Sequence, residues 1–292
     1  MELNTLAQFL VVARLEHLSR AAEELHVAQP SLSRSIARLE GELGTPLFDR
    51  AGRLRLNDAG RLFRDHVERA LGELDAGRRA VAESTGEGFG TVRLASETFL
   101  TLTGPLAAFK RAHPDIEVEL RQLPAEEMAR RLRAQEVDLC VSSQPIPAEG
   151  LQPVRLFDDP VGVGVSADHP LADRASVRVE ELAAEPFIAT SAGHWQRRLL
   201  DRLFAARDLT PKIVCEVDEP SAIAELIGAG LGVALVPGFG RRAGAPRLPV
   251  TWVAVDDPDS RRTVTLSWWD GAHLSSAARL MRTAITEWPW TA

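Results

Sequence analysis

Residues 19–55 constrain the fold of this 292-residue chain more than any other stretch, because they read as two short helices with a tight turn between them. Ser19 is a suitable N-cap for the first of these helices. Pro30 falls in the first turn of the second helix, where its missing N–H costs nothing, and Gly44 is a suitable C-cap at the other end. Residues 3–13 also carry apolar residues at helical spacing. The sequence therefore predicts a compact helical domain containing a helix-turn-helix.

The side of the second helix that faces away from the predicted core is polar. Hydroxyls at a helix N-terminus can bond to phosphates or base edges, and an arginine one turn later can reach a guanine edge with two hydrogen bonds. A glutamine can make an equivalent pair of bonds to adenine. This face would therefore suit the major groove of DNA, and its candidate contact residues are Gln29, Pro30, Ser31, Ser33, Arg34 and Arg38.

Arginines also follow the second helix. Gly52 marks a short hairpin. Its cationic sides, formed by Arg50, Arg53 and Arg55, would contact phosphates or the minor groove. Helix-turn-helix shapes also occur as plain packing units, and arginine-rich surfaces are often only solvated. Residues 29–64 nevertheless hold seven arginines against four acidic residues, whereas the whole chain has a net charge of −7, and this local concentration of positive charge favours DNA binding.

Two N-terminal motifs, AAEELHVAQPSLSRSIARLEGELGTPLFDR at residues 21–50 and LNDAG at 56–60, resemble those of the LysR-type transcriptional regulators. That family usually has Thr-Glu-Ala-Gly where this chain has Asn-Asp-Ala-Gly. The change is mild, because asparagine caps a helix and aspartate suits its first turn. Further segments follow in the family's order through nearly the whole chain: HPDIEVEL (113–120), VDL (137–139), DHPLA (168–172), EPFI (185–188) and AGLGVALVPG (229–238).

The resemblance implies a regulator that binds double-stranded DNA at an interrupted inverted repeat and responds to a small-molecule effector. It implies a winged helix-turn-helix domain at residues 1–58, a linker helix and hinge at 59–88, and an effector-binding domain at 89–292. The expected partners are DNA, an effector of unknown identity, further copies of the chain in a homodimer or homotetramer, and RNA polymerase. The alternative is a solute-binding protein without a DNA function, because such proteins share the architecture of the C-terminal domain.

Six residues of the expected linker are spaced 4, 3, 4, 3 and 4 positions apart, which is the seam of a helix that pairs with a partner helix. The alternative is a single helix packed on its own domain. The resemblance favours a dimer, whose twofold symmetry would bring two recognition helices to two half-sites one turn apart. The seam residues are Phe63, Val67, Ala70, Leu74, Gly77 and Val81.

Strand-like and helix-like segments alternate after the expected hinge. A strand–helix–strand–helix–strand run at residues 91–143 predicts a parallel sheet covered by helices, and a second unit of this kind follows. The segment RRTVTLSWW at 261–269 is expected to cross back to the first unit. The predicted fold class is α/β with an N-terminal winged helix-turn-helix, and the effector domain is expected to resemble periplasmic binding proteins, with subdomain I at 91–160 plus 266–292 and subdomain II at 161–265.

The expected effector site follows from the sheet topology. Ligands of open α/β sheets bind at the carboxyl ends of strands, beside helix N-termini. Hydroxyls there favour a carboxylate or phosphate, although serine and threonine also simply cap helices. Three acids, Glu97, Asp218 and Glu219, would favour a cationic or amine-bearing effector if they face inward. By this rule and by the resemblance, the candidate residues are Ser96, Thr98, Ser142, Ser143, Thr190, Ser191, Asp218, Ser221 and Pro237.

Nothing in the sequence predicts an enzyme. It contains no phosphate-loop Lys-Ser/Thr pair, nucleophile-elbow serine or HExxH run. The histidines are scattered, and Cys140 and Cys215 lie far apart in apolar surroundings, so we expect buried, reduced thiols, no metal site and no cofactor. No apolar run is long enough to span a bilayer, and no basic start precedes an apolar stretch. These features predict a cytoplasmic protein without a membrane partner.

Overall fold

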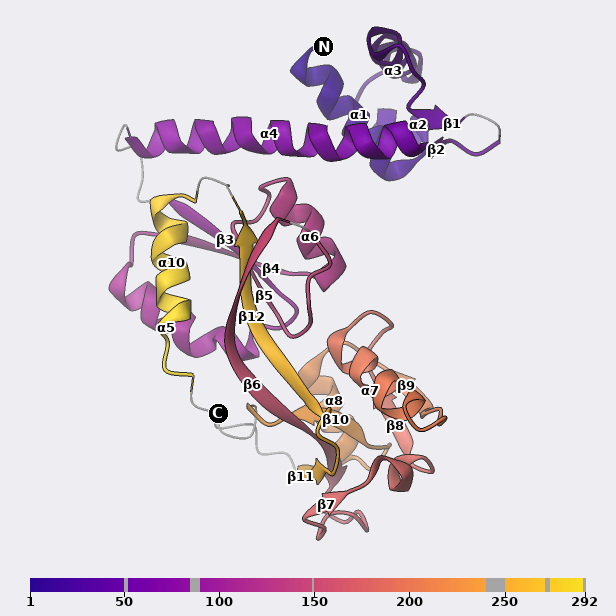
Figure 1. Ribbon diagram of the computed structural model, residues 1–292, viewed down its shortest axis with the longest axis vertical. Helices are drawn as coiled ribbons and strands as arrows, with labels where there is room; N and C mark the ends of the chain where they lie inside the picture. The colour runs from indigo at the N-terminus through magenta and orange to yellow at the C-terminus, as the bar shows by residue number, and fades with distance from the viewer. Residues whose placement is uncertain (50–51, 85–89, 149, 240–249, 271–273, 291–292) are drawn as a thin grey trace. The chain divides into compact units, whose positions relative to one another are not determined.

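The computed structural model describes the chain except for residues 50–51, 85–89, 149, 240–249, 271–273 and 291–292. The chain divides into two compact units, one built on residues 1–88 and the other on most of residues 89–292. The first unit is mainly helical and the second is a mixed α/β domain (Figure 1).

Helices and a two-stranded hairpin form the first unit (Figure 1). The predicted helix-turn-helix is present as α2 and α3, which meet at a turn where His26 adopts a left-handed conformation with φ 53°. The hairpin after α3 is also present, with Phe48 opposite Leu56 in an antiparallel pair. The elements are α1 (Leu3–Leu15), α2 (Leu18–Glu24), α3 (Gln29–Leu43), β1 (Phe48–Asp49), β2 (Arg55–Leu56) and α4 (Asp58–Ser84).

An aromatic cluster and one carboxylate hold the hairpin against the helices. The ring of Phe9 is fully buried, and its centroid lies 5.7 Å from that of Phe48 and 5.3 Å from that of Phe63. Glu40 Oε1 accepts the backbone N–H groups of Leu47 and Phe48 at 2.8 and 3.3 Å. Because Glu40 belongs to α3, these bonds fix the start of the hairpin relative to that helix.

The helix ends differ from the sequence prediction at one place. The N-cap of α2 is His17 and not Ser19, because α2 begins at Leu18 and the Nδ1 atom of His17 accepts the backbone N–H of Arg20 at 3.4 Å. An imidazole nitrogen can fill the acceptor role that serine usually plays, so the sequence pattern missed it. The prediction for α3 is confirmed, since Gly44 caps that helix with φ 70°.

The start of α4 depends on two residues of the LNDAG motif. Asn57 Oδ1 accepts the backbone N–H of Gly60 at 2.8 Å, so asparagine is the cap that the sequence predicted. A Cβ atom added to Gly60 would lie 2.1 Å from the carbonyl oxygen of Leu47. Glycine is therefore required where α4 passes the chain that leads into the hairpin.

The predicted seam of α4 divides into two parts. Val67 is buried and Phe63 is half-buried, and both belong to the hydrophobic core of the first unit. Leu74 and Val81 are 49% and 64% exposed. Within one chain, the N-terminal part of the seam thus packs on its own domain, and the C-terminal part presents apolar surface.

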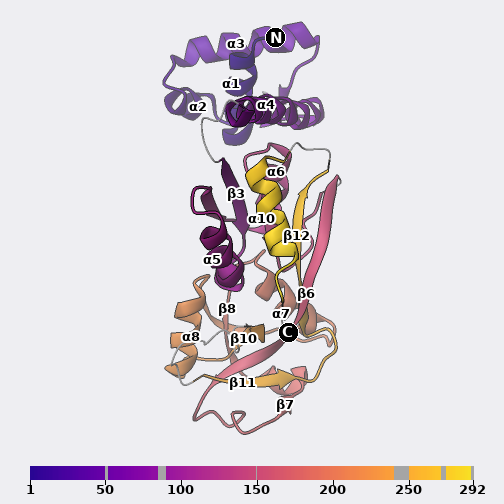
Figure 2. The ribbon, with the colours of Figure 1, turned by 90° about the vertical axis from the view of Figure 1, so that its left-hand side faces the viewer.

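Two strands, β6 (Leu151–Ser166) and β12 (Arg261–Trp269), pair antiparallel and connect two subdomains of the second unit (Figure 2). Subdomain I has β3, β4 and β5 beside β12, in the order β4-β3-β5-β12-β6. In subdomain II, β10 and β11 pair with β6, and β8 pairs with β9. The remaining strands are β3 (Thr91–Ser96), β4 (Glu117–Gln122), β5 (Leu139–Ser142), β7 (Ser176–Val177), β8 (Pro186–Ala189), β9 (Lys212–Glu216), β10 (Ala234–Pro237) and β11 (Val250–Val255).

Helices cover the sheet of each subdomain. In subdomain I, α5 and α10 lie on one side of the sheet and α6 on the other (Figure 1). In subdomain II, α7 packs against a separate hydrophobic core in which the rings of Phe187 and Phe204 meet edge to face at 5.4 Å. The helices are η1 (Leu100–Leu102), α5 (Thr103–Ala112), α6 (Ala125–Arg133), η2 (Val179–Leu182), α7 (Trp195–Ala205), α8 (Pro220–Gly228) and α10 (Ser276–Thr286).

The predicted parallel run is confirmed, because β3 pairs in parallel with both β4 and β5. The second strand–helix run, which forms subdomain II, is less regular than expected. The apolar segment VGVGVS at 161–166, which opens the second strand–helix run in the sequence, is the second half of β6, and β6 already begins at Leu151. Two prolines, Pro153 and Pro160, and the charged residues Arg155, Asp158 and Asp159 interrupt the apolar pattern of the first half, so the sequence did not reveal it. The strand β11 was not predicted, and it pairs antiparallel with β6.

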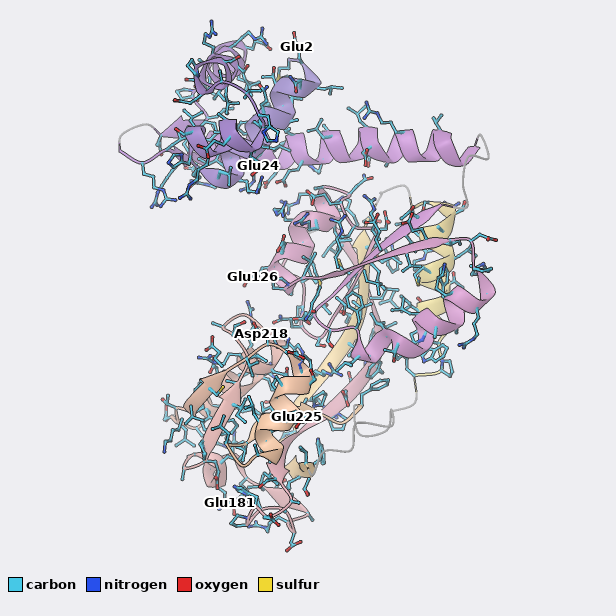
Figure 3. The ribbon with its side chains drawn as sticks, turned by 180° about the vertical axis from the view of Figure 1, so that it is seen from behind. Glu2, Glu24, Glu126, Glu181, Asp218 and Glu225 are labelled. Carbon is cyan, nitrogen blue, oxygen red and sulfur yellow. The ribbon has the colours of Figure 1, made fainter. Side chains whose placement is uncertain are left out.

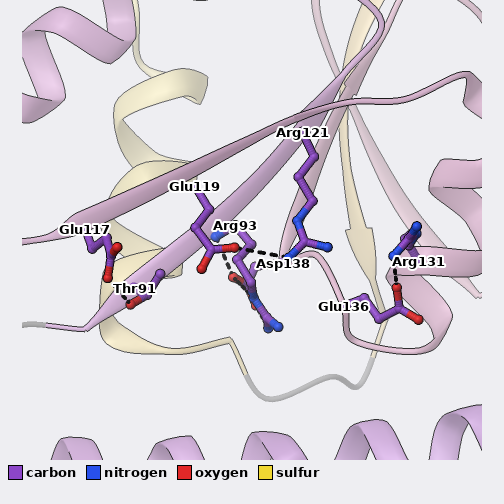
Figure 4. Close-up of polar contacts among 8 residues, drawn as sticks. All are labelled: Thr91, Arg93, Glu117, Glu119, Arg121, Arg131, Glu136 and Asp138. Atoms are coloured by element: carbon purple, nitrogen blue, oxygen red, sulfur yellow. Dashed lines mark hydrogen bonds and ion pairs between the residues drawn. The ribbon is translucent and has the colours of Figure 1, made fainter. Parts of the chain in front are cut away.

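An ion pair with little solvent exposure ties the parallel strands together (Figure 4). Asp138, just before β5, accepts the backbone N–H of Arg93 on β3 at 2.7 Å, and the Nη2 atom of Arg93 lies 2.9 Å from its other carboxylate oxygen. Both side chains are nearly buried, and the backbone bond and the ion pair share one carboxylate. Figure 4 also shows Glu119 of β4 beside Arg121 on the same strand, at 3.2 Å.

The two cysteines differ in burial. Cys140 on β5 is buried as expected, and burial raises the pKa of its thiol well above the usual range, with a smaller contribution from Asp138. Cys215 is only half-buried, because β9 pairs with β8 and alternate residues of β9 are exposed. Among the helices of the described residues, none combines the length and apolar character needed to cross a membrane.

Candidate functional site

The helix α3 has one buried side and one exposed side. Leu32, Ile36 and Leu39 are buried in the core of the first unit. Ser33 is half-buried, since it lies at the boundary between the two sides. The other predicted contact residues are fully on the exposed side: Gln29, Pro30, Ser31, Arg34 and Arg38.

The two arginines of α3 are held only loosely. Arg34 Nε donates to the carbonyl oxygen of Pro30 at 3.3 Å, which orients its guanidinium along the N-terminal turn of the helix. Arg38 Nη2 lies 3.8 Å from a carboxylate oxygen of Glu2, and both side chains are more than half exposed. Exposed pairs of this kind contribute little to stability, so a phosphate could replace the Glu2 carboxylate at low cost.

The hairpin next to α3 presents further cationic side chains. Arg55 on β2 is exposed and lies opposite Asp49 of β1. Arg53 is also exposed and follows Gly52, whose φ of 100° favours glycine. Arg50, which the sequence also predicted to contact DNA, lies outside the described residues.

The second candidate site lies where β6 and β12 connect the subdomains. Asp159 of β6 and Arg262 of β12 face each other in the strand register. They are 3% and 4% exposed, and Arg262 Nε and Nη2 lie 2.9 and 2.8 Å from Asp159 Oδ2. Arg262 Nη1 also donates to Ser143 Oγ of subdomain I at 3.1 Å, and its guanidinium lies over the Trp195 ring of subdomain II, 4.8 Å from the centroid. One guanidinium therefore contacts both subdomains.

A second carboxylate, Glu97, lies at the end of β3 beside this ion pair. It is 3% exposed, and its two oxygens accept the backbone N–H of Ser143 at 2.7 Å and the side-chain amide of Gln144 at 2.5 Å. Burial raises the pKa of Glu97, although the bonds from Ser143 and Gln144 and the nearby charge of Arg262 act in the opposite direction. Of the three acids whose direction the sequence left open, Glu97 faces inward.

Gln144 connects this carboxylate to the other subdomain. Its Nε2 atom donates both to Glu97 and to the carbonyl oxygen of Gly193 in subdomain II, the latter at 3.1 Å. Its Oε1 atom is buried and accepts no hydrogen bond from the described residues. We call Glu97, Ser143, Gln144, Asp159, Trp195 and Arg262 the junction cluster.

His194 lies next to the junction cluster as the N-cap of α7, where its ring accepts the backbone N–H of Gln196 at 3.4 Å. Burial lowers the pKa of His194, while the charge of Asp218 opposes the shift and that of Arg262 adds to it. A neutral ring is therefore favoured at neutral pH, so His194 supplies no compensating positive charge to the cluster.

The structure brings some predicted effector residues together at the strand ends of subdomain I. Ser143 belongs to the junction cluster itself. Ser96 and Ser142 are buried beside it, but their hydroxyls donate at 2.8 Å to the carbonyl oxygens of Thr98 and Gln144. Thr98 is half-buried, and its hydroxyl accepts the N–H of Leu100 at 3.3 Å. These hydroxyls therefore stabilise local turns of the backbone, which resembles the capping role that the sequence offered as the alternative to ligand binding.

The predicted residues of subdomain II are more dispersed. Asp218 is exposed on the edge of subdomain II that faces subdomain I (Figure 3), and it accepts both the N–H and the hydroxyl of Ser191, at 2.8 and 2.9 Å. Ser221 is exposed and bonds to Glu219, which is exposed as well. Pro237 is half-buried at the end of β10.

Thr190 differs from the other predicted effector residues in the hydrogen bonding of its side chain. It is 2% exposed, and its hydroxyl has no hydrogen-bond partner among the described residues. It lines a small hollow within subdomain II that is partly open to solvent. Gln196 and Arg197 of α7 also line this hollow, so it has a polar side.

Sequence reasoning missed most of the junction cluster. Asp159 and Arg262 are 103 residues apart and meet only through strand register, so no local pattern could find them. Gln144 directly follows the predicted Ser142–Ser143 pair, and Trp195 begins α7. The rule that ligands lie at strand ends and helix N-termini could have found these two. Within the described residues, no group of three or more potential metal ligands lies together.

Two family models match the chain. The model described as "Bacterial regulatory helix-turn-helix protein, lysR family" matches residues 3–61, and the model described as "LysR substrate binding domain" matches residues 85–290. The first match contains α1 to α3 and the hairpin, and the second contains the whole α/β unit.

Relatives match along nearly the full length. The chain is 33% identical over 286 residues to "Uncharacterized HTH-type transcriptional regulator YybE" of Bacillus subtilis (strain 168), which covers 97% of each protein. It is 32% identical over 270 residues to "Transcriptional dual regulator GltC" of the same strain, covering 90% of this chain and 89% of GltC.

Solved structures agree with the fold. A full-length OxyR variant from Pseudomonas aeruginosa has a TM-score of 0.65 at 22% identity, covering 98% of this chain and 94% of that one. The LysR family transcriptional regulator CbnR has a TM-score of 0.64 at 19% identity, covering 98% of both. At these identities the likeness concerns the fold, including the helix-turn-helix and the two-subdomain α/β domain.

Proposed function

The chain belongs to the LysR family of bacterial transcriptional regulators, and from that premise we propose that it reads a specific DNA site through the exposed face of α3. It is a DNA-binding regulator with an effector-binding domain. The observation that carries the proposal is the side of α3 on which Gln29, Ser31 and Arg34 are exposed while the opposite side is buried. These side chains are the types that reach base edges in the major groove, with Ser33 at the margin and Pro30 at the first turn.

Cationic residues near α3 would hold the DNA backbone. Arg38 on α3 and Arg53 in the hairpin are exposed, and Arg50 is assigned the same role from the sequence. Phosphate contacts fix the register of a protein on DNA, whereas base contacts select the sequence. Substitution at these three arginines is therefore expected to weaken binding to all DNA sequences alike.

We propose that the regulator acts as a homodimer or homotetramer on an interrupted inverted repeat. The exposed part of the α4 seam, which includes Leu74 and Val81, supplies apolar surface for helix pairing. The related structure "full-length CbnR complexed with the target DNA" has the same fold, with a TM-score of 0.63 at 20% identity. Twofold symmetry would place two copies of α3 on two half-sites.

The effector is proposed to bind the C-terminal domain and to favour one arrangement of the subdomains over another. A ligand shifts such an equilibrium only by its differential affinity for the two states. The candidates are the junction cluster, with Ser143, and the hollow at Thr190. The family and the relatives are transcriptional regulators, so we propose a regulatory role acting on RNA polymerase in the cytoplasm, not a catalytic one.

The test is the capture of genomic fragments by the purified protein, with random DNA as competitor. Enrichment of an interrupted inverted repeat is expected, and the adjacent genes would indicate the pathway of the effector. The Arg34→Ala protein should lose this enrichment, whereas Arg14→Ala, which removes an arginine of α1 from the same unit, should keep it. If no sequence is enriched with or without a cell extract as the source of effector, the assignment of α3 is wrong.

A further inference from the structure

We propose that the effector carries a positively charged nitrogen, such as an ammonium or amidinium group, which binds the carboxylate of Glu97 beside Gln144 Oε1. The inference rests on the proposed effector role of the C-terminal domain and names the chemical class of the ligand. It starts from the charges of the junction cluster.

The junction cluster is short of one positive charge. It contains the carboxylates of Glu97 and Asp159 but only one guanidinium, that of Arg262. Arg262 is engaged by Asp159 through two nitrogen atoms and by Ser143 through a third. A buried charge without a counterion is costly, so the cluster favours either a proton on Glu97 or a cation supplied from outside.

Two other carboxylates of this domain with little solvent exposure each have their own cation. Asp138 pairs with Arg93 at 2.9 Å, and Asp159 pairs with Arg262 at 2.8 Å. In the described part of the chain, Glu97 forms no such ion pair, and its partners are the neutral groups of Ser143 and Gln144. Each oxygen of Glu97 therefore keeps acceptor capacity, since an ionised carboxylate offers about four lone-pair sites.

Groups around Glu97 do not supply the missing charge. The charge of Arg198 lowers the pKa of Glu97 less than that of Arg262 does, and the Arg198 guanidinium is half exposed and pairs with Glu126 of α6. Burial keeps His194 neutral. Burial also raises the pKa of Glu97, as expected for a buried carboxyl without a cation of its own.

Gln144 provides a second acceptor at the same place. Its Oε1 atom is buried and accepts no hydrogen bond from the described residues, while its Nε2 atom donates to Glu97 and to the carbonyl oxygen of Gly193. An ammonium group carries up to three donors and an amidinium four, which suits one carboxylate and one amide oxygen together. Because Gln144 joins Glu97 of subdomain I to Gly193 of subdomain II, a cation bound here would act on a contact that crosses between the subdomains.

The test compares three five-carbon probes that differ only in their end groups: pentane-1,5-diamine, 5-aminopentanoate and glutarate. Binding to the full-length protein would be measured by calorimetry, with thermal shift as a second readout. The two amines are expected to bind the wild-type protein at least tenfold more tightly than they bind Glu97→Gln, and glutarate is expected not to bind. Amine affinity should also fall as acid protonates Glu97.

Controls separate a lost site from a damaged fold. Glu97→Gln keeps the size of the side chain and can still accept the N–H of Ser143, and its melting curve would verify folding. Glu219→Gln removes an exposed acid of the same domain and should bind the amines like the wild type. Failure of both amines to bind, binding that Glu97→Gln leaves unchanged, or preference for glutarate would each overturn the proposal. Enrichment of an inverted repeat by the same preparation would show that only this inference, and not the proposed DNA function, had failed.

Discussion

The exposed face of α3 and the junction cluster both use arginine, but they place it in opposite environments. Arg34 is exposed, and its nearest polar contact is the carbonyl of Pro30, one turn away. Arg262 is 4% exposed, and its partner Asp159 is 103 residues away in the sequence. A charge in water can be removed at little cost to the fold, whereas a buried pair cannot lose one member without leaving the other uncompensated. Substitutions in the first region are therefore expected to leave the fold intact, whereas substitutions in the second are expected to destabilise it.

The largest loss of stability is expected from breaking the buried ion pair of Asp159 and Arg262. Asp159→Ala would leave the guanidinium of Arg262 buried without its carboxylate and would also remove the acceptor of the Phe239 N–H, at 2.8 Å. Such a loss costs about 3–5 kcal/mol of unfolding free energy. Urea denaturation followed by tryptophan fluorescence would measure it, with Asp173→Ala, at an exposed aspartate of the same domain, as the matched control. Equal stabilities of the two variants would contradict the contrast drawn between buried and exposed charge.

Substitution on the exposed face of α3 should weaken DNA binding and leave the stability of the fold almost unchanged. Arg34→Ala is expected to cost about 1–3 kcal/mol of binding free energy at the specific DNA site, because a bidentate contact to a base would be lost. Its unfolding free energy should stay within about 0.5 kcal/mol of the wild type, as for most surface changes. Competition binding on specific and random duplexes would measure the first value. An equal loss on both duplexes would reduce Arg34 to a phosphate contact.

The same contrast explains how much the sequence could predict. The helix-turn-helix, the cap at Asn57 and the parallel strands β3 to β5 follow from local rules, because helix caps and apolar periodicity act over a few residues. The division of α3 into a buried and an exposed side could be predicted for the same reason, since its residues are close in the sequence.

Only part of the junction cluster could be predicted from the sequence. The strand-end rule pointed to Ser143, and it placed Glu97 nearby without deciding its direction. Whether Glu97 turns inward depends on the donors that Ser143 and Gln144 offer, and these lie more than 40 positions away. The pairing of Arg262 with Asp159 depends on the register of β12 against β6, which no local pattern encodes.

A smaller effect is expected on the pH dependence of stability, through the buried carboxyl of Glu97. The pKa of Glu97 is raised in the folded protein, so the folded state binds its proton more tightly than the unfolded state does. The contribution of Glu97 to stability is therefore complete at pH values below the usual carboxyl range and is lost as pH rises through its raised pKa. In Glu97→Gln this decrease should vanish, and in Glu219→Gln it should persist. Urea denaturation between about pH 4 and about pH 7 would compare them, and parallel curves for all three proteins would refute the shift.

The smallest effect concerns two hydroxyls that are equally buried but differently bonded. Thr190 Oγ1 has no partner among the described residues, whereas Ser142 donates to the carbonyl oxygen of Gln144 at 2.8 Å. Thr190→Val keeps the shape and removes an unsatisfied polar group, so the unfolding free energy should stay unchanged or rise by up to about 1 kcal/mol. Ser142→Ala should instead lose about 1 kcal/mol. If Thr190 contacts the effector, its valine variant should weaken the effector response while DNA binding stays intact. A stability loss in Thr190→Val as large as that in Ser142→Ala would mean that its hydroxyl is bonded in solution, and Thr190 would then belong to the fold rather than to the site.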